Sequence, residues 1–204
     1  LGIDHVNVLG HTLEEICGNK VGIYKKTANN FTILDQPEKQ KMFDIMNDRL
    51  AKIGCISKLN IIPKFEKLND VKLGISGDFQ VVNASLATAL SINHLQKIGK
   101  DNSIISNSNI TEAENGLLWD SKMEIPDFVK KGLQDCKWEG RCQTIETDTV
   151  TWFLDGAHTI DSIEKSSDWF VQEQIKSNKN DKKRVLLFNQ QSRAENLKSF
   201  LTYI

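Results

Sequence analysis

Several features that would place a protein in a special class are missing from this 204-residue sequence. No apolar run approaches the roughly 20 residues that a membrane-spanning helix needs. The four cysteines (Cys17, Cys55, Cys136 and Cys142) include no C-x-x-C pair, which excludes zinc and redox motifs of that spacing. Cysteines without a pairing pattern fit a reducing compartment better than a disulfide scaffold.

The chain also lacks an excess of charge of either sign. Its 26 lysines and arginines are balanced by 27 acidic residues, and the formal net charge is −1. No global field therefore favours nucleic acid or an anionic membrane. The four tryptophans are too dispersed to form a stacking platform for bases. We expect no nucleic-acid partner and no membrane span.

The two ends of the sequence lack the signs of a complete chain. The first residue is Leu1 rather than methionine, and it stands in a strand-like stretch. The sequence stops at "SFLTYI" without a closing element. We expect this chain to be a piece of a longer protein.

Strand-like apolar runs alternate with helical patterns, which predicts an α/β fold. The expected strands are residues 29–36 and 57–63, and residues 71–80 are expected to form a strand and a turn. One helix is expected to begin at Thr12, and further helices are expected over residues 38–54, 81–99 and 125–138. Residues 100–122 are rich in Asn and Ser, which predicts a loop-rich surface insertion.

The pattern changes after residues 137–141, which we interpret as a domain boundary. A hairpin is expected next, with strands at about 142–146 and 150–154 and a turn at Thr147 and Asp148. After the hairpin, the sequence predicts a helix over 160–177, an apolar strand, "RVLLFN", at 184–189, and a helix from Arg193.

Lys20 falls on the apolar face of the first expected helix. Thr12 and Glu15 have the spacing of a capping box, which starts that helix. Leu13, and then Ile16 and Lys20 three and seven positions later, share one face. The lysine is therefore predicted to point toward the core. The alternative is that its amine reaches past its own stem to solvent.

Asp155 ends an apolar strand in "WFLDGAHT", Gly156 permits a tight turn, and His158 precedes a helix. Ligands of open α/β sheets bind beyond the carboxyl ends of strands. Asp155 could there take ribose hydroxyls, while the helix N-terminus favours an anion. The alternative is that Asp155 caps the turn before the helix.

Two further polar residues are candidates for a site. Arg141, in "WEGRCQ", stands at the expected boundary, where a guanidinium can reach a phosphate or a base; the alternative is a solvated surface arginine. Asn83 stands early in the long helix, and its alternative is a local cap or turn contact.

These features occur in the order found in folylpolyglutamate synthases, which are ATP-dependent amide ligases of the superfamily that includes the Mur ligases. "GIDHVNVLGHTLEEICGNKVGIYKK" resembles the family segment D-H-x-x-x-L-G-x-T-x-x-x-I-A-x-x-K-A-G-I-x-K. "GDFQVVNASLATAL" is similar to G-x-H-Q-x-x-N-A-x-L-A, "WEGRCQ" to W-x-G-R-x-E/Q, and "LDGAHT" to D-G-A-H. Cys17 and Val21 stand where alanine is usual, and Phe79 where histidine is common.

The resemblance implies a two-part architecture. Residues 1–137 match the later portion of a P-loop-type central, ATP-binding domain, and residues 138–204 match the first portion of a Rossmann-like C-terminal domain. The phosphate loop G-x-x-x-x-G-K-S/T occurs nowhere in the sequence and is expected before Leu1, together with a metal-binding glutamate.

The resemblance also implies a role for each candidate residue. His5 matches a histidine ligand of Mg²⁺, and Lys20 matches the active-site lysine, which is carbamylated in some members and then joins the metal site. Arg141 and Asp155 match residues that hold ATP, and Asn83 matches an asparagine near the adenine. His158 is assigned to the active-site cleft.

The implied reaction adds L-glutamate to a folate through an acyl phosphate, with ATP and Mg²⁺ and with a monovalent cation as a further candidate cofactor. The expected protein is a monomer of the cytoplasm, the mitochondria or both. The alternatives are a dihydrofolate synthase or other Mur-type amide ligase, and a catalytically inactive nucleotide-binding fragment.

Overall fold

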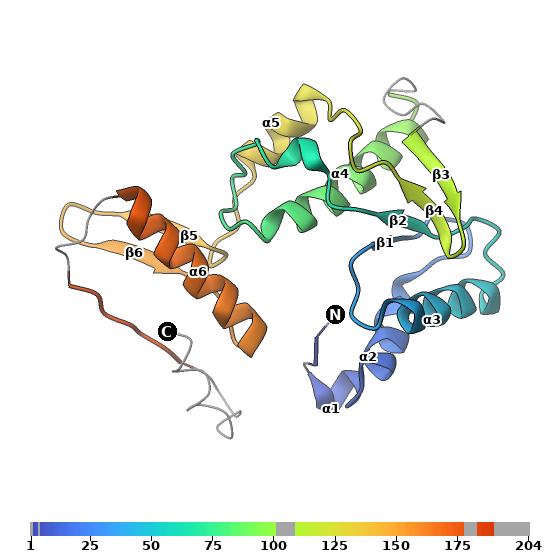
Figure 1. The fold of residues 1–204 in the computed structure, drawn as a ribbon, viewed down its shortest axis with the longest axis horizontal. Coiled ribbons are helices and arrows are strands. Elements are labelled where there is room, and N and C mark those ends of the chain that lie inside the picture. Colours follow the sequence, from blue (N-terminus) through green and yellow to red (C-terminus); the bar gives the residue numbers. More distant parts are fainter. Residues whose placement is uncertain (1, 4, 101–108, 178–182, 190–204) are drawn as a thin grey trace. The chain divides into compact units, whose positions relative to one another are not determined.

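The structure, a computed structural model, describes residues 2–3, 5–100, 109–177 and 183–189 (Figure 1). The chain divides into two compact units. The first comprises Leu1–Val71 and Val81–Gly132, and the second comprises Lys72–Gln80 and Leu133–Ile204. The expected boundary at 137–141, and the match of residues 1–137 and 138–204 to two ligase domains, stay predictions.

A four-stranded sheet organises the first unit. Its order is β1-β2-β4-β3, with β1 at Phe31–Ile33, β2 at Asn60–Ile62, β3 at Ile110–Ala113 and β4 at Gly116–Trp119. β1, β2 and β4 are parallel, and β3 runs antiparallel to β4 at the edge. The predicted strands at 29–36 and 57–63 are therefore confirmed.

The prediction of a loop-rich insertion is wrong for residues 110–119, which form β3 and β4. The apolar run "GLLW" inserts β4 beside β2, where Leu117 donates its backbone N–H to the Leu59 carbonyl at 2.7 Å. Trp119 is buried, and its indole N–H donates to Asn60 Oδ1 at 3.0 Å. The remaining stretch of that prediction, residues 101–108, lies outside the described residues.

The helix α2 of the first unit begins where its sequence signal predicts. α2 spans Leu13–Lys20 after the short helix α1 at Val6–Leu9, and α3 spans Lys39–Lys52. Thr12 Oγ1 accepts from the Glu15 amide while Glu15 Oε2 accepts from the Thr12 amide, both at 3.2 Å, so the predicted capping box is confirmed. α2 and α3 share one apolar core, made by Cys17, Val21, Tyr24, Met42, Phe43, Met46, Leu50, Leu59 and Ile61.

The long helix α4 spans Gln80–Lys97 and stops before Gly99, whose φ of 68° is left-handed. The 3₁₀ helices are Val21–Ile23 and Glu66–Leu68, and the helix after Pro126 is α5, Asp127–Asp135. Of the strand and turn predicted at 71–80, the strand is wrong and the turn is confirmed. Gly77 has φ 102° and Gly74 donates its N–H to the Leu133 carbonyl at 3.0 Å, so this segment turns instead of extending.

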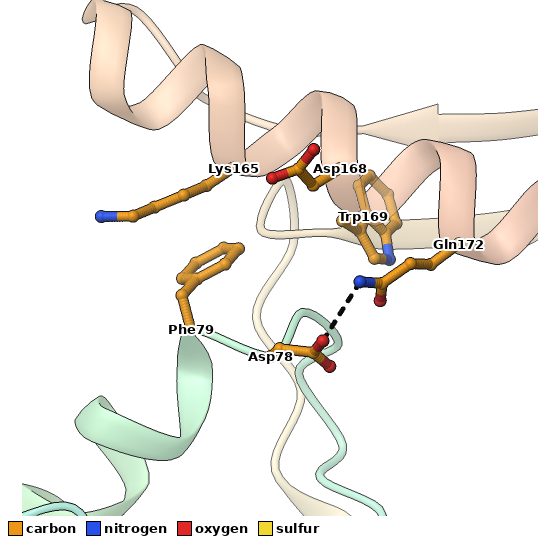
Figure 2. A pocket seen from close by; sticks show the side chains of 6 residues that line it. All are labelled: Asp78, Phe79, Lys165, Asp168, Trp169 and Gln172. Carbon is orange, nitrogen blue, oxygen red and sulfur yellow. Dashed lines mark hydrogen bonds between the residues drawn. The ribbon is translucent and has the colours of Figure 1, made fainter.

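The second unit contains the predicted hairpin and helix. β5 at Gln143–Glu146 pairs antiparallel with β6 at Thr151–Leu154, and α6 covers Ile160–Ser177. Phe153 packs edge-on against Trp169 and Phe170, with ring centroids 5.7 and 5.0 Å apart, so one face of the hairpin is covered by α6. Trp169 also lines the pocket shown in Figure 2.

The strand predicted for residues 184–189 is wrong. Those residues adopt no regular secondary structure, and the side chains of Val185 and Leu187 are 82% and 79% exposed. The helix predicted from Arg193 falls outside the described residues. Among the described helices, none is both long and apolar enough to cross a membrane.

Candidate active site

Two loops of the second unit lie side by side and carry three of the candidate residues. They are residues 138–142 and 155–158, called the paired loops below. Asp155 joins them, because its Oδ2 accepts from the Cys142 backbone N–H and its Oδ1 from the Ala157 backbone N–H, each at 2.8 Å. The carboxylate thus caps the turn, as the alternative interpretation proposed, and it is only half-buried. A contact to ribose stays a prediction.

Arg141 stands in the first of the paired loops with an exposed side chain. Its guanidinium lies against the backbone of Gly156, and a Cβ added to Gly156 would overlap Arg141 Nη1. From the sequence, Gly156 was interpreted only as a residue that permits a tight turn. The structure adds that the missing side chain leaves space for the guanidinium, which no local sequence signal reveals.

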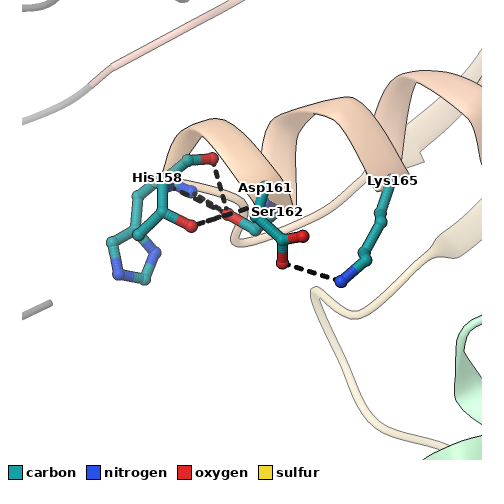
Figure 3. Close-up of polar contacts among 5 residues, drawn as sticks. His158, Asp161, Ser162 and Lys165 are labelled. Carbon is teal, nitrogen blue, oxygen red and sulfur yellow. Dashed lines mark hydrogen bonds and ion pairs between the residues drawn. The ribbon is translucent and has the colours of Figure 1, made fainter. Parts of the chain in front are cut away.

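His158 ends the second of the paired loops and leads into α6 (Figure 3). Its Nδ1 lies 2.8 Å from the Gly156 carbonyl oxygen. Because a carbonyl can only accept, Nδ1 carries the proton, and in the neutral ring Nε2 then holds the lone pair. The interaction fixes both the tautomer and the orientation of the imidazole.

The start of α6 is capped by two hydroxyl side chains. Ser162 Oγ accepts from the backbone N–H groups of His158 and Thr159 at 3.0 and 2.9 Å. Thr159 Oγ1 in return accepts from the Ser162 N–H at 3.3 Å. This reciprocal arrangement satisfies N–H groups at the helix start and holds His158 in place.

Cys142 is buried beneath the paired loops and its Sγ lies 3.5 Å from Asp155 Oδ2. Burial, and then the negative charge of Asp155, raise the pKa of the Cys142 thiol to about 12. The thiol therefore stays protonated near neutral pH, and since the thiolate is the nucleophile, Cys142 is a structural residue.

Lys20 does not point into the core, so that prediction is wrong. The side chain is exposed, whereas its neighbour Val21 is buried. The buried face of α2 continues from Cys17 by four residues to Val21, which moves Lys20 to the border of the apolar stripe. Its position in the last turn favours a cation by the helix dipole.

The other candidates of the first unit are also at the surface. His5 is exposed, has φ 52°, and its carbonyl accepts from the backbone N–H groups of Val8 and Leu9. Asn83 is exposed on the second turn of α4. The convergence of His5 and Lys20 on one divalent ion stays a prediction.

The described residues do not supply a complete magnesium site. Within them, no three His, Cys, Asp or Glu side chains gather closely enough to hold a metal ion. Mg²⁺ demands near-octahedral geometry and oxygen ligands, and neither His5 nor an unmodified Lys20 provides a carboxylate oxygen.

Comparison with known proteins places these observations in a family context. No protein-family model matches the chain. The curated folylpolyglutamate synthases of Saccharomyces cerevisiae strains S288c and RM11-1a are each 42% identical over 196 residues, which cover 96% of this chain and 32% of each relative. The chain thus spans about a third of the length of the curated relatives it matches.

Solved structures agree in fold. A serine-to-alanine mutant of L. casei FPGS superposes with a TM-score of 0.59 at 19% identity, over 84% of this chain and 40% of that one. A structure described as an FPGS–AMPPCP complex gives 0.59 at 18% identity, over 99% of this chain and 54% of that one. The chain therefore shares the α/β fold of these structures, and the predicted fold class is confirmed. In sequence it is 42% identical to about a third of the length of the yeast folylpolyglutamate synthases.

Proposed function

We propose that this chain forms part of a folylpolyglutamate synthase, an ATP-dependent ligase that adds L-glutamate to folates. The observation that carries the proposal is the 42% identity to yeast enzymes of that name over nearly the whole chain. The paired loops support it, because they bring the W-x-G-R and D-G-A-H motifs into direct contact.

The proposed chemistry begins with transfer of the γ-phosphoryl group of ATP to the terminal carboxylate of the folate. The products are ADP and an acyl phosphate. The amine of the incoming glutamate then attacks the acyl carbon, an amide bond forms, phosphate leaves with the electron pair of the broken C–O bond, and the amine loses a proton. The chain's own residues would supply orientation rather than covalent chemistry.

The paired loops would bind the nucleotide. Arg141 presents a cation that is always charged and can bind phosphate oxygens with two N–H groups. Asp155, through its two backbone hydrogen bonds, would hold the loop that carries Arg141 in register with Gly156 and His158. Asn83 remains the candidate for the adenine. Mg²⁺ would be held by His5 together with a carbamylated Lys20, because carbamylation adds the carboxylate-like oxygens that an unmodified lysine lacks.

The test measures ADP formation by the protein made from the complete reading frame that contains this sequence. We expect ADP only when a folate, L-glutamate and Mg²⁺ are all present, because phosphoryl transfer and amide formation are coupled. Equal ADP release without glutamate would indicate a plain nucleotidase and contradict the proposal. Turnover with dihydropteroate instead of the folate would favour a dihydrofolate synthase. The 204-residue chain by itself is expected to show no ligase activity.

The change Gly156→Ala tests the nucleotide role of Arg141 in that protein. The new methyl group would displace the far end of a flexible side chain, so the free energy of unfolding should change by less than about 0.5 kcal/mol. Loss of one guanidinium–phosphate contact should weaken ATP binding about tenfold, which is about 1.4 kcal/mol. Calorimetric titration with ATP measures the dissociation constant.

The control for this variant is Gly132→Ala in α5, where no heavy atom lies within 4 Å of the added Cβ. It should bind ATP like the unchanged protein. Unaltered ATP affinity in the Gly156→Ala variant would remove Arg141 from the nucleotide site.

A further inference from the structure

The turn between β3 and β4 contains the only Asn-Gly pair of the sequence, Asn115 and Gly116. An asparagine followed by glycine is especially reactive, because glycine has no Cβ to hinder the approach of its backbone nitrogen to the neighbouring side-chain amide. Glu114 and Asn115 form the turn, and Glu114 is exposed. The pair therefore lies at the tip of a hairpin, where water has access.

The strand β3, which leads into this turn, is supported on one side only. Within the described residues it pairs with β4 alone, and residues 111–113 are exposed. Segments with few buried contacts open locally at a low free energy, without global unfolding. Fraying of β3 would release the turn while β4 stays paired with β2.

Two side chains of α3, the helix beside the tip of the hairpin (Figure 1), hold the turn in place. Gln40 Nε2 donates to Asn115 Oδ1 and Asn115 Nδ2 donates to Gln40 Oε1, both at 3.3 Å. Asn47 Nδ2 donates to the Asn115 backbone carbonyl at 3.1 Å. The contacts with Gln40 direct the Asn115 amide toward α3. They must break before that amide can turn toward the Gly116 nitrogen.

We propose that Asn115 is a site of spontaneous deamidation whose rate α3 controls through Gln40. In the open turn, the Gly116 backbone nitrogen gives its proton to a solvent base and attacks Asn115 Cγ. A C–N bond forms, the bond from Cγ to Nδ2 breaks, and Nδ2 takes up a proton and leaves as ammonia. Water then hydrolyses the succinimide at either carbonyl carbon, which gives aspartate or isoaspartate. The proposal does not depend on the ligase activity.

The Asp-Gly pair of the sequence, Asp155 and Gly156, provides an internal comparison, because the same ring could close there. Both Asp155 oxygens accept from backbone N–H groups at 2.8 Å, and hydrogen bonds to an ionised group are stronger than those between neutral amides. An ionised carboxylate is also a poor electrophile. We therefore expect the modification at Asn115 and not at Asp155.

Either product should loosen the hairpin. Aspartate at position 115 cannot donate to Gln40 Oε1, and it places a second carboxylate beside Gln40 Nε2, which already donates to Asp44 Oδ1 at 2.9 Å. Isoaspartate lengthens the main chain between β3 and β4, so the pairing of Ala113 with Gly116 cannot be kept. The modification thus acts as an irreversible timer on the stability of the first unit.

The experiment incubates the 204-residue chain in mildly alkaline buffer and follows each asparagine by peptide mass spectrometry. Methylation by an isoaspartyl methyltransferase counts the isoaspartate. We expect Asn115 to react at least about tenfold faster than Asn19 and Asn69, which is about 1.4 kcal/mol in the barrier; both are exposed but precede residues with side chains. The rate should rise with pH, because the attacking nitrogen must lose its proton.

Three variants test the control by α3. Gln40→Ala should speed the reaction about threefold to tenfold, because it removes two hydrogen bonds of ordinary strength. Gln134→Ala, at an exposed residue of α5, should leave the rate unchanged. Asn115→Gln should abolish the reaction, since a six-membered ring closes far more slowly, and its urea midpoint should stay constant while that of the unchanged chain falls during incubation.

Three results would overturn the proposal. The first is that Asn115 reacts no faster than Asn19 and Asn69. The second is that Gln40→Ala leaves the rate at Asn115 unchanged. The third is that isoaspartate accumulates at Asp155 as fast as at Asn115.

Discussion

Replacing Gly116 by alanine is expected to lower the free energy of unfolding by about 3 kcal/mol or more. Gly116 has φ 153°, a conformation that side chains other than glycine rarely adopt, and an added Cβ would overlap the backbone oxygen of Leu59. Backbone strain of this kind costs about 1–3 kcal/mol, and overpacking adds about 1–3 kcal/mol. The Leu59 oxygen cannot move away, because it accepts from the Leu117 N–H and belongs to a buried residue.

Urea unfolding followed by circular dichroism measures this effect. The matched control is Gly18→Ala in α2, where the added Cβ meets nothing within 4 Å. Alanine in a helix interior is favoured over glycine by about 0.5–1 kcal/mol, so the control should be as stable as the unchanged chain or more so. Equal urea midpoints for Gly116→Ala and the unchanged chain would show that β4 does not pair with β2 as described.

Replacing Asp155 by alanine should destabilise the second unit by about 2–4 kcal/mol. Its two oxygens accept from the Cys142 and Ala157 amides, and a hydrogen bond to a charged group contributes about 1.5–3 kcal/mol. Both amides would lose their acceptor, and the paired loops would separate. Amide hydrogen exchange gives a local readout, because the Cys142 and Ala157 N–H groups should exchange faster in the variant.

Two further variants sharpen this prediction. Asp155→Asn keeps one acceptor oxygen, so an intermediate loss is expected and one of the two amides should stay protected. Asp148→Ala alters an exposed carboxylate in the β5–β6 turn of the same hairpin and should change the free energy of unfolding by less than about 0.5 kcal/mol. Unchanged exchange at Cys142 in Asp155→Ala would mean that Asp155 does not join the loops.

The elements predicted correctly are those set by neighbouring residues. The capping box of Thr12 and Glu15 starts α2, and the stop at Gly99 follows from a left-handed backbone that glycine adopts freely. The hairpin at 143–154 was also visible, since its turn is closed locally: the Thr147 N–H donates to the Val150 carbonyl at 2.9 Å.

The errors arise where distant segments decide the structure. β4 was not predicted because its neighbour β2 lies more than fifty residues earlier in the chain. The Asn- and Ser-rich residues that precede β4 also favoured the prediction of a loop. Burial of Lys20 was misjudged because positions separated by three and by four residues both remain near one helical face. Packing against α3 selected Val21 instead, and the sequence alone does not contain that choice.

In the candidate site too, the local motifs could be predicted from the sequence and the contacts between distant segments could not. The motifs around Arg141 and Asp155 were recognised in the sequence, but not the hydrogen bond from Cys142 to Asp155 or the space that Gly156 leaves for the guanidinium. Those contacts depend on how the loop after α5 meets the loop after β6. His5, Lys20 and Asn83 remain surface residues of the first unit, with their roles in metal and nucleotide binding still to be measured.

The position of β4 inside the sheet has a consequence for synthesis on the ribosome. Until Trp119 has emerged, β2 has a neighbour on one side only, and its other side presents unpaired N–H and C=O groups that invite pairing with another chain. The first unit can therefore complete this sheet only after β4 has been synthesised, and a nascent chain that stalls between α4 and β4 would expose an unpaired strand edge. Chaperone protection is most valuable in that interval.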